Sequence, residues 1–443
     1  MSLEMKYPAS SIDETTYCRI IDDLLHRLFP ICRSITGKGL RDTLRIISEY
    51  IPFNLIEIPT GTEIFDWKVP LEWNIRDAFI KNAAGERIVD FQKSNLHVIS
   101  YSVPVHLRMG LDKLRPHLHT IPSQPDAIPY LTSYYQKDWG FCLTHNQYEA
   151  LPDGEYEVYI DSSLEPGSLT LAEFVLPGET EDEIYFSTYC CHPSMANNEL
   201  SGPIIVTLLY KYLVSLKKRR YTYRFYYGPE TIGALAYLSL RGQHLKEKLV
   251  AGLVVTCCGD RGSFTYKQTR DKNSLLDKVV VHSLEHSGVE FRILPFFPTG
   301  SDDRQYCSPG FNLPIGSLMR SMYGTYPEYH NSLDNLDFVS IASLFQTFQV
   351  YVNIIYILEH NRFFRNLKPF GEPHLSKYDL YHSIGGQRVQ NQHIKYLRYI
   401  LNFSDEKHDL IDIADSLSRP IWELEPAVND LLDVGLLEKI CVA

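Results

Sequence analysis

The chain has 443 residues, of which 44% are hydrophobic and 22% are charged, and its formal net charge is -11. This length exceeds one ordinary hydrophobic core, so two or three domains are expected. The acidic balance argues against a general nucleic-acid binder, which needs a basic surface to neutralise phosphates.

The cysteines and the apolar segments bear on the compartment. Nine cysteines are an odd number, and two pairs are adjacent in sequence, without the CxxC spacing typical of zinc sites. We expect reduced, mostly packed thiols and a cytoplasmic protein. The N-terminus lacks the apolar core of a secretory signal, and no segment is expected to reach the roughly 20 apolar residues that cross a membrane.

The first third of the chain combines helices with a β-rich segment. Apolar residues recur at helical spacing between about residues 11 and 50, and the break at 33–37 predicts two helices. A strand is expected at 54–59. The segment 63–151 lacks helical periodicity and is broken by turn-forming residues, which favours an inserted β-rich domain.

From about residue 154 to residue 360 the pattern changes to alternating strands and helices. We expect strands at 155–160, 184–189, 223–227 and 249–256, with helices at 203–215 and 233–245 between them. This alternation predicts a largely parallel sheet covered by helices, and therefore the α/β class. The expected domain comprises residues 1–62 and 152–365, interrupted by the insert.

A proline-bearing stretch at 366–373 precedes a third domain, expected at 370–443. Short helices at 392–401, 410–417 and 421–432, followed by a strand near 435–440, predict a winged helix. Residues 371–443 contain seven lysines and arginines against twelve aspartates and glutamates. Such a surface repels phosphates, so we expect no nucleic-acid partner and disfavour the alternative of a DNA-binding head on a sensor. Packing against another domain or subunit is the expected role.

Polar side chains follow three of the predicted strands. His192 and Asn198 come after 184–189, Glu230 follows 223–227, and Asp260 follows 249–256. Each has a structural explanation when taken singly, as a loop residue, a turn former or a complement to a helix dipole. Because ligands collect at the carboxyl ends of parallel strands, three such ends in series favour a common site.

Two later segments add to this set. Asp302 lies in a polar loop at 298–306, and His330 stands just ahead of a predicted helix, where an N-capping side chain is the structural alternative. Together with His192, Glu230 and Asp260, His330 supplies the nitrogen and carboxylate groups that zinc prefers, with one glutamate left for proton transfer. The sequence contains no GxSxG nucleophile motif and no phosphate-binding glycine loop.

The order of motifs between residues 192 and 336 supports a family resemblance. It runs His, Asn-Asn-Glu-Leu-Ser-Gly, Glu-Thr-Ile-Gly, Gly-Asp, Gly-Ser-Asp-Asp and Tyr-His-Asn-Ser-Leu-Asp-Asn-Leu. This order resembles the co-catalytic zinc aminopeptidase superfamily, which includes bacterial leucyl aminopeptidases and glutamate carboxypeptidases. More closely, the chain is similar to a bacterial aminopeptidase-like family with an inserted domain of unknown function and a C-terminal winged helix. The resemblance covers nearly the whole chain and implies a mostly parallel, zinc-peptidase-like mixed sheet flanked by helices.

The resemblance implies roles for individual residues. His192 and His330 match metal-ligand histidines, and Glu230 matches the general base. Asn198 falls where the superfamily has an aspartate that bridges two metals. Asp260 is the nearest candidate for the next acidic ligand, with Thr256 competing for that place.

Other positions depart from the superfamily or concern the substrate. Ser194 replaces the aspartate that orients the first histidine, and Thr231 replaces a second, metal-binding glutamate. Candidates for orienting the substrate are Asp302, Arg304, Arg320 and Tyr323.

The departures bear on the number of metal ions. A bridging carboxylate neutralises charge between two cations about 3.5–4 Å apart, and a neutral amide does not. Because Asn198 and Thr231 are both neutral, we predict one firmly held zinc ion, with a second doubtful. In the expected mechanism zinc polarises the amide carbonyl, zinc and Glu230 activate a water molecule, and the proton returns to the leaving amine.

Two classes of function remain open. The leading hypothesis is a zinc-dependent, aminopeptidase-like hydrolase that cleaves peptide or other amide bonds in small substrates. The alternative is a degenerate peptidase that uses its cleft to bind a ligand or a partner. His117 and His119 of the insert could chelate a metal, although histidines in a proline-rich surface loop are common, and narrowing the cleft is the favoured role of the insert. Assembly into a homo-oligomer stays open.

Overall fold

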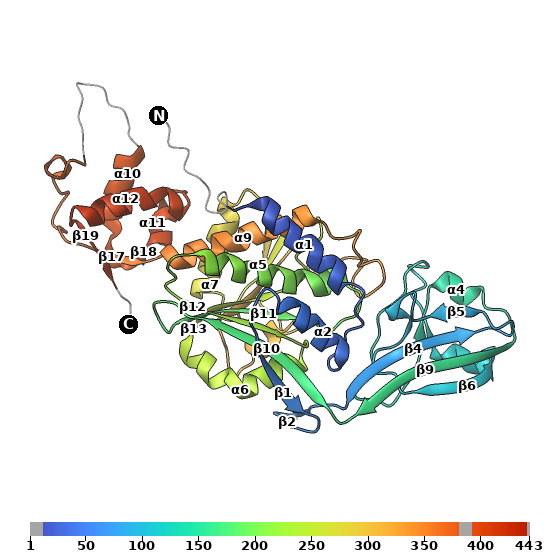
Figure 1. Cartoon of the computed structure of the whole chain (residues 1–443). Helices are drawn as coiled ribbons and strands as arrows, with labels where there is room; N and C mark the ends of the chain where they lie inside the picture. Colours follow the sequence, from blue (N-terminus) through green and yellow to red (C-terminus); the bar gives the residue numbers. More distant parts are fainter. Residues whose placement is uncertain (1–11, 381–391, 441–443) are drawn as a thin grey trace. The chain divides into compact units, whose positions relative to one another are not determined.

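The computed structural model describes residues 12–380 and 392–440 (Figure 1). By contacts between Cα atoms the chain divides into two compact units. One comprises residues 13–276 and 290–348, and contains the large sheet and the insert. The other comprises, of the described residues, 12, 277–289, 349–380 and 392–440, and contains the winged helix.

An eight-stranded mixed sheet forms the centre of the first unit. Its strand order is β1-β10-β12-β11-β13-β16-β14-β15. The bounds are β1 (Asn54–Pro59), β10 (Ser168–Leu176), β11 (Glu183–Tyr189), β12 (Thr222–Gly228), β13 (Leu249–Val255), β14 (Phe264–Lys267), β15 (Phe291–Leu294) and β16 (Ile315–Met319). The four central strands β12, β11, β13 and β16 pair in parallel. On one side β10 pairs antiparallel with β12 and with β1, and on the other side β14 pairs antiparallel with β16 but parallel with the edge strand β15. This α/β architecture confirms the predicted fold class.

Central strand β11 is buried along its whole length. Its β-branched and aromatic residues fit a strand that is covered on both faces, as parallel sheets require. The carboxyl ends of β11, β12 and β13 therefore lie side by side at one edge, which positions the loops that follow them.

Helices cover both faces of the sheet. The helices of this unit are α1 (Glu14–Leu28), α2 (Lys38–Ile47), α5 (Ser201–Ser215), α6 (Ile232–Lys248) and the short α8 (Asp303–Tyr306). α5 packs on β11 and β13 and contacts α1, whereas α6 packs on β10 and β13 and lies on the opposite face (Figure 1). A Cβ atom at Gly202 would lie 2.1 Å from the carbonyl oxygen of Val255, so only glycine permits this close approach of α5 to β13.

The insert is built around a second, four-stranded antiparallel sheet. Its order is β5-β4-β9-β6, formed by β4 (Glu72–Lys81), β5 (Arg87–Asp90), β6 (Val105–Gly110) and β9 (Glu155–Glu165). The assignment of residues 155–160 to the peptidase-like sheet was wrong, because β9 pairs with β4 and β6. Alternating burial along β9 indicates a strand but does not identify its partners, which are distant in sequence.

Several short elements connect these sheets. They are β2 (Glu63–Ile64), β3 (Trp67–Lys68), β7 (Leu118–His119), β8 (Phe141–Cys142), α3 (Leu111–Leu114), α4 (His145–Glu149), the 3-10 turns η2 (Asn95–His97) and η3 (Arg115–His117), and the π-helical turn η4 (Ala196–Leu200).

The second unit contains a winged helix and two helical segments that support it. The sheet order is β18-β17-β19, with β17 (Phe363–Asn366), β18 (Asp405–Asp409) and β19 (Leu437–Ile440). The helices are α10 (Gln392–Phe403), α11 (Leu410–Ser416), α12 (Ile421–Asp433) and the 3-10 turn η5 (Leu375–Tyr378). They are joined by most of α7 (Leu275–His286) and by the part of α9 (Ile341–His360) from residue 349 onward. Nδ1 of His282 lies 2.6 Å from Oδ1 of Asp415, and the ammonium of Lys278 lies 2.6 Å from Asp409, so α7 is tied to the winged helix by polar contacts.

Helix α9 departs from the expectation that no segment reaches membrane-spanning length. Within the described residues it is the one helix long and apolar enough by composition to cross a membrane. In the structure 72% of its apolar window is buried inside the protein, as in the core helix of a folded domain.

Candidate active site

The loop after β11 carries the first functional residues. β11 ends at Tyr189, and the chain turns through Cys190, Cys191 and His192 before the π-helical turn η4 leads into α5. Single π-helical turns occur frequently at functional sites. All five residues of η4 are buried, and the carboxylate of Asp334 accepts the backbone N–H groups of Asn197 and Asn198 at 2.6 and 2.9 Å.

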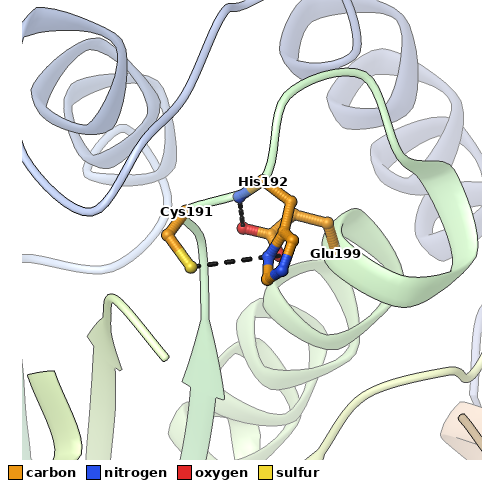
Figure 2. A group of neighbouring side chains, drawn as sticks. All are labelled: Cys191, His192 and Glu199. Carbon is orange, nitrogen blue, oxygen red and sulfur yellow. Dashed lines mark hydrogen bonds and ion pairs between the residues drawn. The ribbon is translucent and has the colours of Figure 1, made fainter. Parts of the chain in front are cut away.

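A buried glutamate holds His192 in place. Oε2 of Glu199 lies 2.6 Å from Nδ1 of His192, and Oε1 accepts the backbone N–H of His192 at 2.8 Å (Figure 2). The sequence analysis assigned no role to Glu199. The signal was present in the Asn-Asn-Glu-Leu-Ser-Gly motif, where a glutamate stands seven residues after a histidine that lacks its usual aspartate at Ser194. The hydroxyl of Ser194 instead donates to the carbonyl of Phe29 at 2.9 Å.

The three residues on which the zinc hypothesis depends come together. Nε2 of His192 lies 3.8 Å from Oε2 of Glu230, which stands between β12 and α6. The ring centroids of His192 and His330 are 5.1 Å apart. The ring of Tyr130, from the insert, lies 5.0 Å from the His192 ring and 5.4 Å from the His330 ring, and the Tyr130 N–H donates to the His330 carbonyl. The insert therefore contributes directly to this site.

These residues line a cavity of about 530 Å³. It is lined by Ile35, Trp67, Tyr130, Leu131, Thr132, Tyr134, Tyr135, Cys191, His192, Glu230, Thr231, Ile232, Arg304 and His330. The lining combines aromatic side chains from the insert, among them Trp67 and Tyr130, with the ionisable groups. A cavity that is mostly apolar, with a few convergent polar groups, is typical of a small-molecule site.

The electrostatics of the two histidines differ. Burial and the neighbouring His192 lower the pKa of His330 to about 3, so its imidazole is neutral. Burial also acts to lower the pKa of His192, but the carboxylates of Glu199 and Glu230 outweigh it and raise this pKa.

Glu230 itself is shifted in the direction expected of a general base that works near neutral pH. Burial raises its pKa, opposed by the positive charges of His192 and Arg304. Its backbone N–H donates to the sulfur of Cys191 at 3.3 Å.

Asp260 does not line the cavity. Its carboxylate accepts from the Asn197 side chain at 2.9 Å, from the Ser321 hydroxyl at 2.7 Å and from the Gly262 N–H at 2.6 Å. Asp260 therefore holds the side chain of Asn197 and stiffens the turn that carries Glu199. Thr256, its competitor for the ligand role, donates its hydroxyl hydrogen to the carbonyl of Asn198 at 2.8 Å.

The proposed substrate-orienting residues divide into two groups. Arg304 lines the cavity, and Asp302 lies directly behind it, accepting the Thr231 N–H at 2.7 Å. Arg320 stacks on Phe264 and bonds to Gln346. Tyr323 accepts from buried Lys267 at 3.0 Å. Neither Arg320 nor Tyr323 is among the residues that line the cavity.

Two imidazoles of the cavity and one amide outside its lining are the candidate donors for a metal ion. Nε2 of His330 and Oδ1 of Asn198 are buried and have no hydrogen-bond partner among the described residues. Since Nδ1 of His192 faces Glu199, its Nε2 remains for a ligand, and a carboxylate behind the ring is the usual support of a zinc-bound histidine. A second ion lacks its ligand, because Thr231 is uncharged and its hydroxyl accepts from Arg304 at 2.8 Å.

The neighbouring group of Cys191, His192 and Glu199 is also close enough to hold a cation (Figure 2). Burial raises the pKa of the Cys191 thiol, however, which opposes formation of the thiolate that binds metal. Both oxygens of Glu199 are already occupied by His192. This group therefore positions the histidine rather than forming a site of its own.

Comparisons with known proteins agree with this geometry. The family described as "Domain of unknown function (DUF4910)" matches residues 22–361, and one described as "winged helix-turn-helix" matches residues 362–439. The chain is 48% identical over 420 residues, covering 95% of this chain and 96% of the relative, to a Clostridium acetobutylicum protein named "Putative polysaccharide biosynthesis protein with aminopeptidase-like domain".

Solved structures share the fold. A crystal structure of a "putative peptidase" from Clostridium acetobutylicum is similar with a TM-score of 0.90 and 46% identity, covering 96% of this chain and 97% of that one. A zinc aminopeptidase from Bacillus subtilis is similar with a TM-score of 0.55 and 11% identity, covering 78% and 95%. At that identity the likeness concerns the fold alone, which is aminopeptidase-like.

Proposed function

Since the chain belongs to the DUF4910 family and has an aminopeptidase-like fold, we propose that it is a hydrolase that uses a single zinc ion to cleave an amide bond in a small substrate. The observation that carries the proposal is the convergence of His192, Glu230 and His330 on one cavity, from three segments far apart in the sequence. Burying a carboxylate, two imidazoles and unpaired acceptor atoms costs folding free energy, and such groups cluster at functional sites.

The residues of the chain have distinct parts in this reaction. His192 and His330 would hold the ion, with Asn198 as a third donor, and Glu199 keeps His192 in the correct orientation. Zinc, when bound, polarises a carbonyl and lowers the pKa of water. Glu230 accepts the proton of the attacking water and returns it to the leaving amine, for which its raised pKa is suited.

The walls of the cavity support a substrate with a ring. Trp67 and Tyr135 line the cavity although 41% and 52% of their surfaces are exposed, and their rings meet edge to face at 5.9 Å. Aromatic faces left open beside a catalytic group offer a stacking surface. The relative from Clostridium acetobutylicum is named for polysaccharide biosynthesis, so we propose an amide-bearing sugar as the substrate class, with a small peptide as the alternative.

The winged helix has a structural part in this proposal. Acidic residues of α12 are engaged inside its own unit, where Glu423 accepts from Tyr396 at 2.7 Å and Asp430 pairs with His393 at 2.8 Å. A helix with several acidic side chains repels the phosphates of nucleic acid, so α12 does not suit DNA binding. We propose that it packs against protein.

A cytoplasmic location is proposed from the cysteines. The eight cysteines within the described residues are all free, and six of them are buried. Free, packed thiols fit a reducing compartment.

Zinc uptake and hydrolysis test the proposal together. Metal-free protein reconstituted with zinc should bind one ion per chain, measured by elemental analysis after gel filtration. His330→Ala should lose that ion, whereas His106→Ala, at an exposed position of the insert, should keep it. Reconstituted protein should release amine from N-acyl sugars or amino-acid amides. Failure to take up zinc would favour the alternative, a degenerate peptidase that binds a ligand in the same cavity.

A further inference from the structure

Arg304 places a fixed positive charge in the candidate cavity. It is the only arginine or lysine among the described residues that line it. Its Nη1 donates to the carbonyl of Gly300 at 2.8 Å, and its Nη2 donates to the hydroxyl of Thr231 at 2.8 Å. Gly300 has a φ of +92°, and a Cβ there would lie 1.9 Å from the Tyr323 ring, so the loop that orients Arg304 requires glycine.

Both acceptors of Arg304 are neutral. Within the described part of the chain no carboxylate lies within ion-pair distance of its guanidinium. The two adjacent aspartates are engaged elsewhere, because Asp302 accepts from the Thr231 backbone and Asp303 pairs with buried Lys267 at 2.6 Å. Guanidinium N–H groups therefore remain for a ligand, since the side chain has five.

The residue at position 231 explains why the guanidinium of Arg304 has no carboxylate partner among the residues described. An acidic side chain at this position would bring a negative charge to the point where the Thr231 hydroxyl meets Arg304. Threonine accepts a hydrogen bond without cancelling the charge. The charge of Arg304 therefore remains available to a ligand in the cavity.

We infer that the substrate carries an anionic group, a carboxylate or a phosphate, close to the scissile amide, and that Arg304 binds it. This inference rests on the proposed function and specifies its substrate. Arginine is suited to this task because its planar fork matches both anions in two-point contact. The anion and the aromatic wall together describe an acidic N-acyl sugar.

The same charge disfavours the substrate of an ordinary aminopeptidase. A free peptide N-terminus brings an ammonium group next to the scissile bond, where Arg304 would repel it. Glu230 attracts such an ammonium group, but its carboxylate already interacts with the positive charges of His192 and Arg304. Arg304 should therefore make the cavity bind acidic molecules in preference to cationic ones.

Calorimetric titration tests the inference through binding alone. The probes are neutral N-acetylglucosamine, its two acidic counterparts N-acetylglucosaminuronic acid and N-acetylglucosamine 1-phosphate, and cationic glucosamine. At least one acid should bind about tenfold or more tightly than the neutral sugar, and glucosamine should bind most weakly. Arg304→Gln should abolish the preference for the acid. Arg108→Gln, at a position where 79% of the side chain is exposed, should retain it.

Three outcomes overturn the inference. The first is that the unmodified protein binds acidic and neutral sugars with equal affinity. The second is that Arg304→Gln still prefers the acid. The third is that no sugar at 20 mM gives a heat of binding. Circular dichroism confirms that Arg304→Gln is folded. Because no turnover is measured, failure here leaves the hydrolase proposal standing, and a failure of zinc uptake or hydrolysis leaves the anion preference standing.

Discussion

Nδ1 of His192 lies 2.6 Å from Oε2 of Glu199, and both side chains are almost fully buried, with exposed fractions of 5% and 0%. A carboxylate at this distance fixes both the tautomer and the orientation of the ring, because only the protonated Nδ1 can donate to it. Nε2 is thereby directed toward Glu230. The glutamate that orients the ring comes from the following turn, whereas the nearby Ser194 hydroxyl donates to the carbonyl of Phe29.

Removing the charge of Glu199 should weaken metal binding. In Glu199→Gln the amide can still accept the His192 backbone N–H, but it no longer supports a ligand histidine electrostatically. We expect zinc affinity to fall about 10- to 100-fold, measured by competition with a chromophoric chelator. Glu179→Gln, at a position that is 59% exposed, is the matched control and should bind zinc normally. An unchanged affinity in Glu199→Gln would contradict the orienting role.

Glu230→Gln should separate chemistry from binding. The substitution is nearly isosteric, but it removes the group that accepts a proton, so kcat should fall about 10²- to 10⁴-fold. Sugar binding by calorimetry should remain within about threefold of the unmodified protein. Retention of full kcat would exclude Glu230 as the general base.

The ring of Tyr130 should contribute to substrate binding by forming part of the cavity wall. Its ring lies against both histidines, and its hydroxyl lies 3.0 Å from that of Tyr134. Tyr130→Ala should raise KM at least tenfold, because it opens the wall contributed by the insert. Tyr130→Phe keeps the ring and should raise KM less than threefold. Equal KM values for the two variants would show that the ring does not form the wall.

The buried pair of Lys267 and Asp303 should give stability a dependence on pH. Burial, opposed by Lys267, raises the pKa of Asp303 from 3.8 to about 6. Between pH 4 and pH 6 the folded state therefore binds more protons than the unfolded state, so stability is lost as pH rises through this window. A shift of this size corresponds to about 3 kcal/mol.

Urea denaturation at pH 4.5 and pH 6.5 measures this contribution. Asp303→Asn removes the titrating group, and the difference in stability between the two pH values should change by up to that amount. The variant should also be less stable overall by about 3–5 kcal/mol, since Lys267 is left buried without its partner. Identical pH profiles for the two proteins would refute the raised pKa.

The winged helix should show no salt-sensitive binding to DNA. Its acidic helix α12 would face phosphates with like charge, so a gel shift at 50 mM salt should give no retarded band. Lys439, on β19, is one of its few cations, and Lys439→Glu should leave this result unchanged. A retarded band that disappears between 50 and 200 mM salt would overturn the assignment.

The sequence by itself determined the class of the fold, and of the site residues that it suggested, His192, Glu230, Arg304 and His330 line the cavity. Strand β1 matches its predicted bounds, and the ends of β11, β12 and β13 lie within one residue of those expected. His192 and Glu230 could be selected from such strand ends because parallel strands deliver their following loops to one edge. The substitutions Asn198 and Thr231, which argue for one metal ion rather than two, were likewise readable from the motifs.

Tertiary structure decided what local patterns do not encode. Three of these features join residues far apart in sequence. They are the pairing of β9 with β4, the hydrogen bond between Asp260 and Asn197 outside the cavity, and the contact of the Tyr130 ring with both histidines. The role of Glu199 depends on the direction of its side chain within a π-helical turn, which periodicity does not reveal. Residue types and their spacing determine which side chains follow the carboxyl ends of the parallel strands. Long-range packing then fixes which of those groups pair with each other and which, like Arg304, remain open to a ligand.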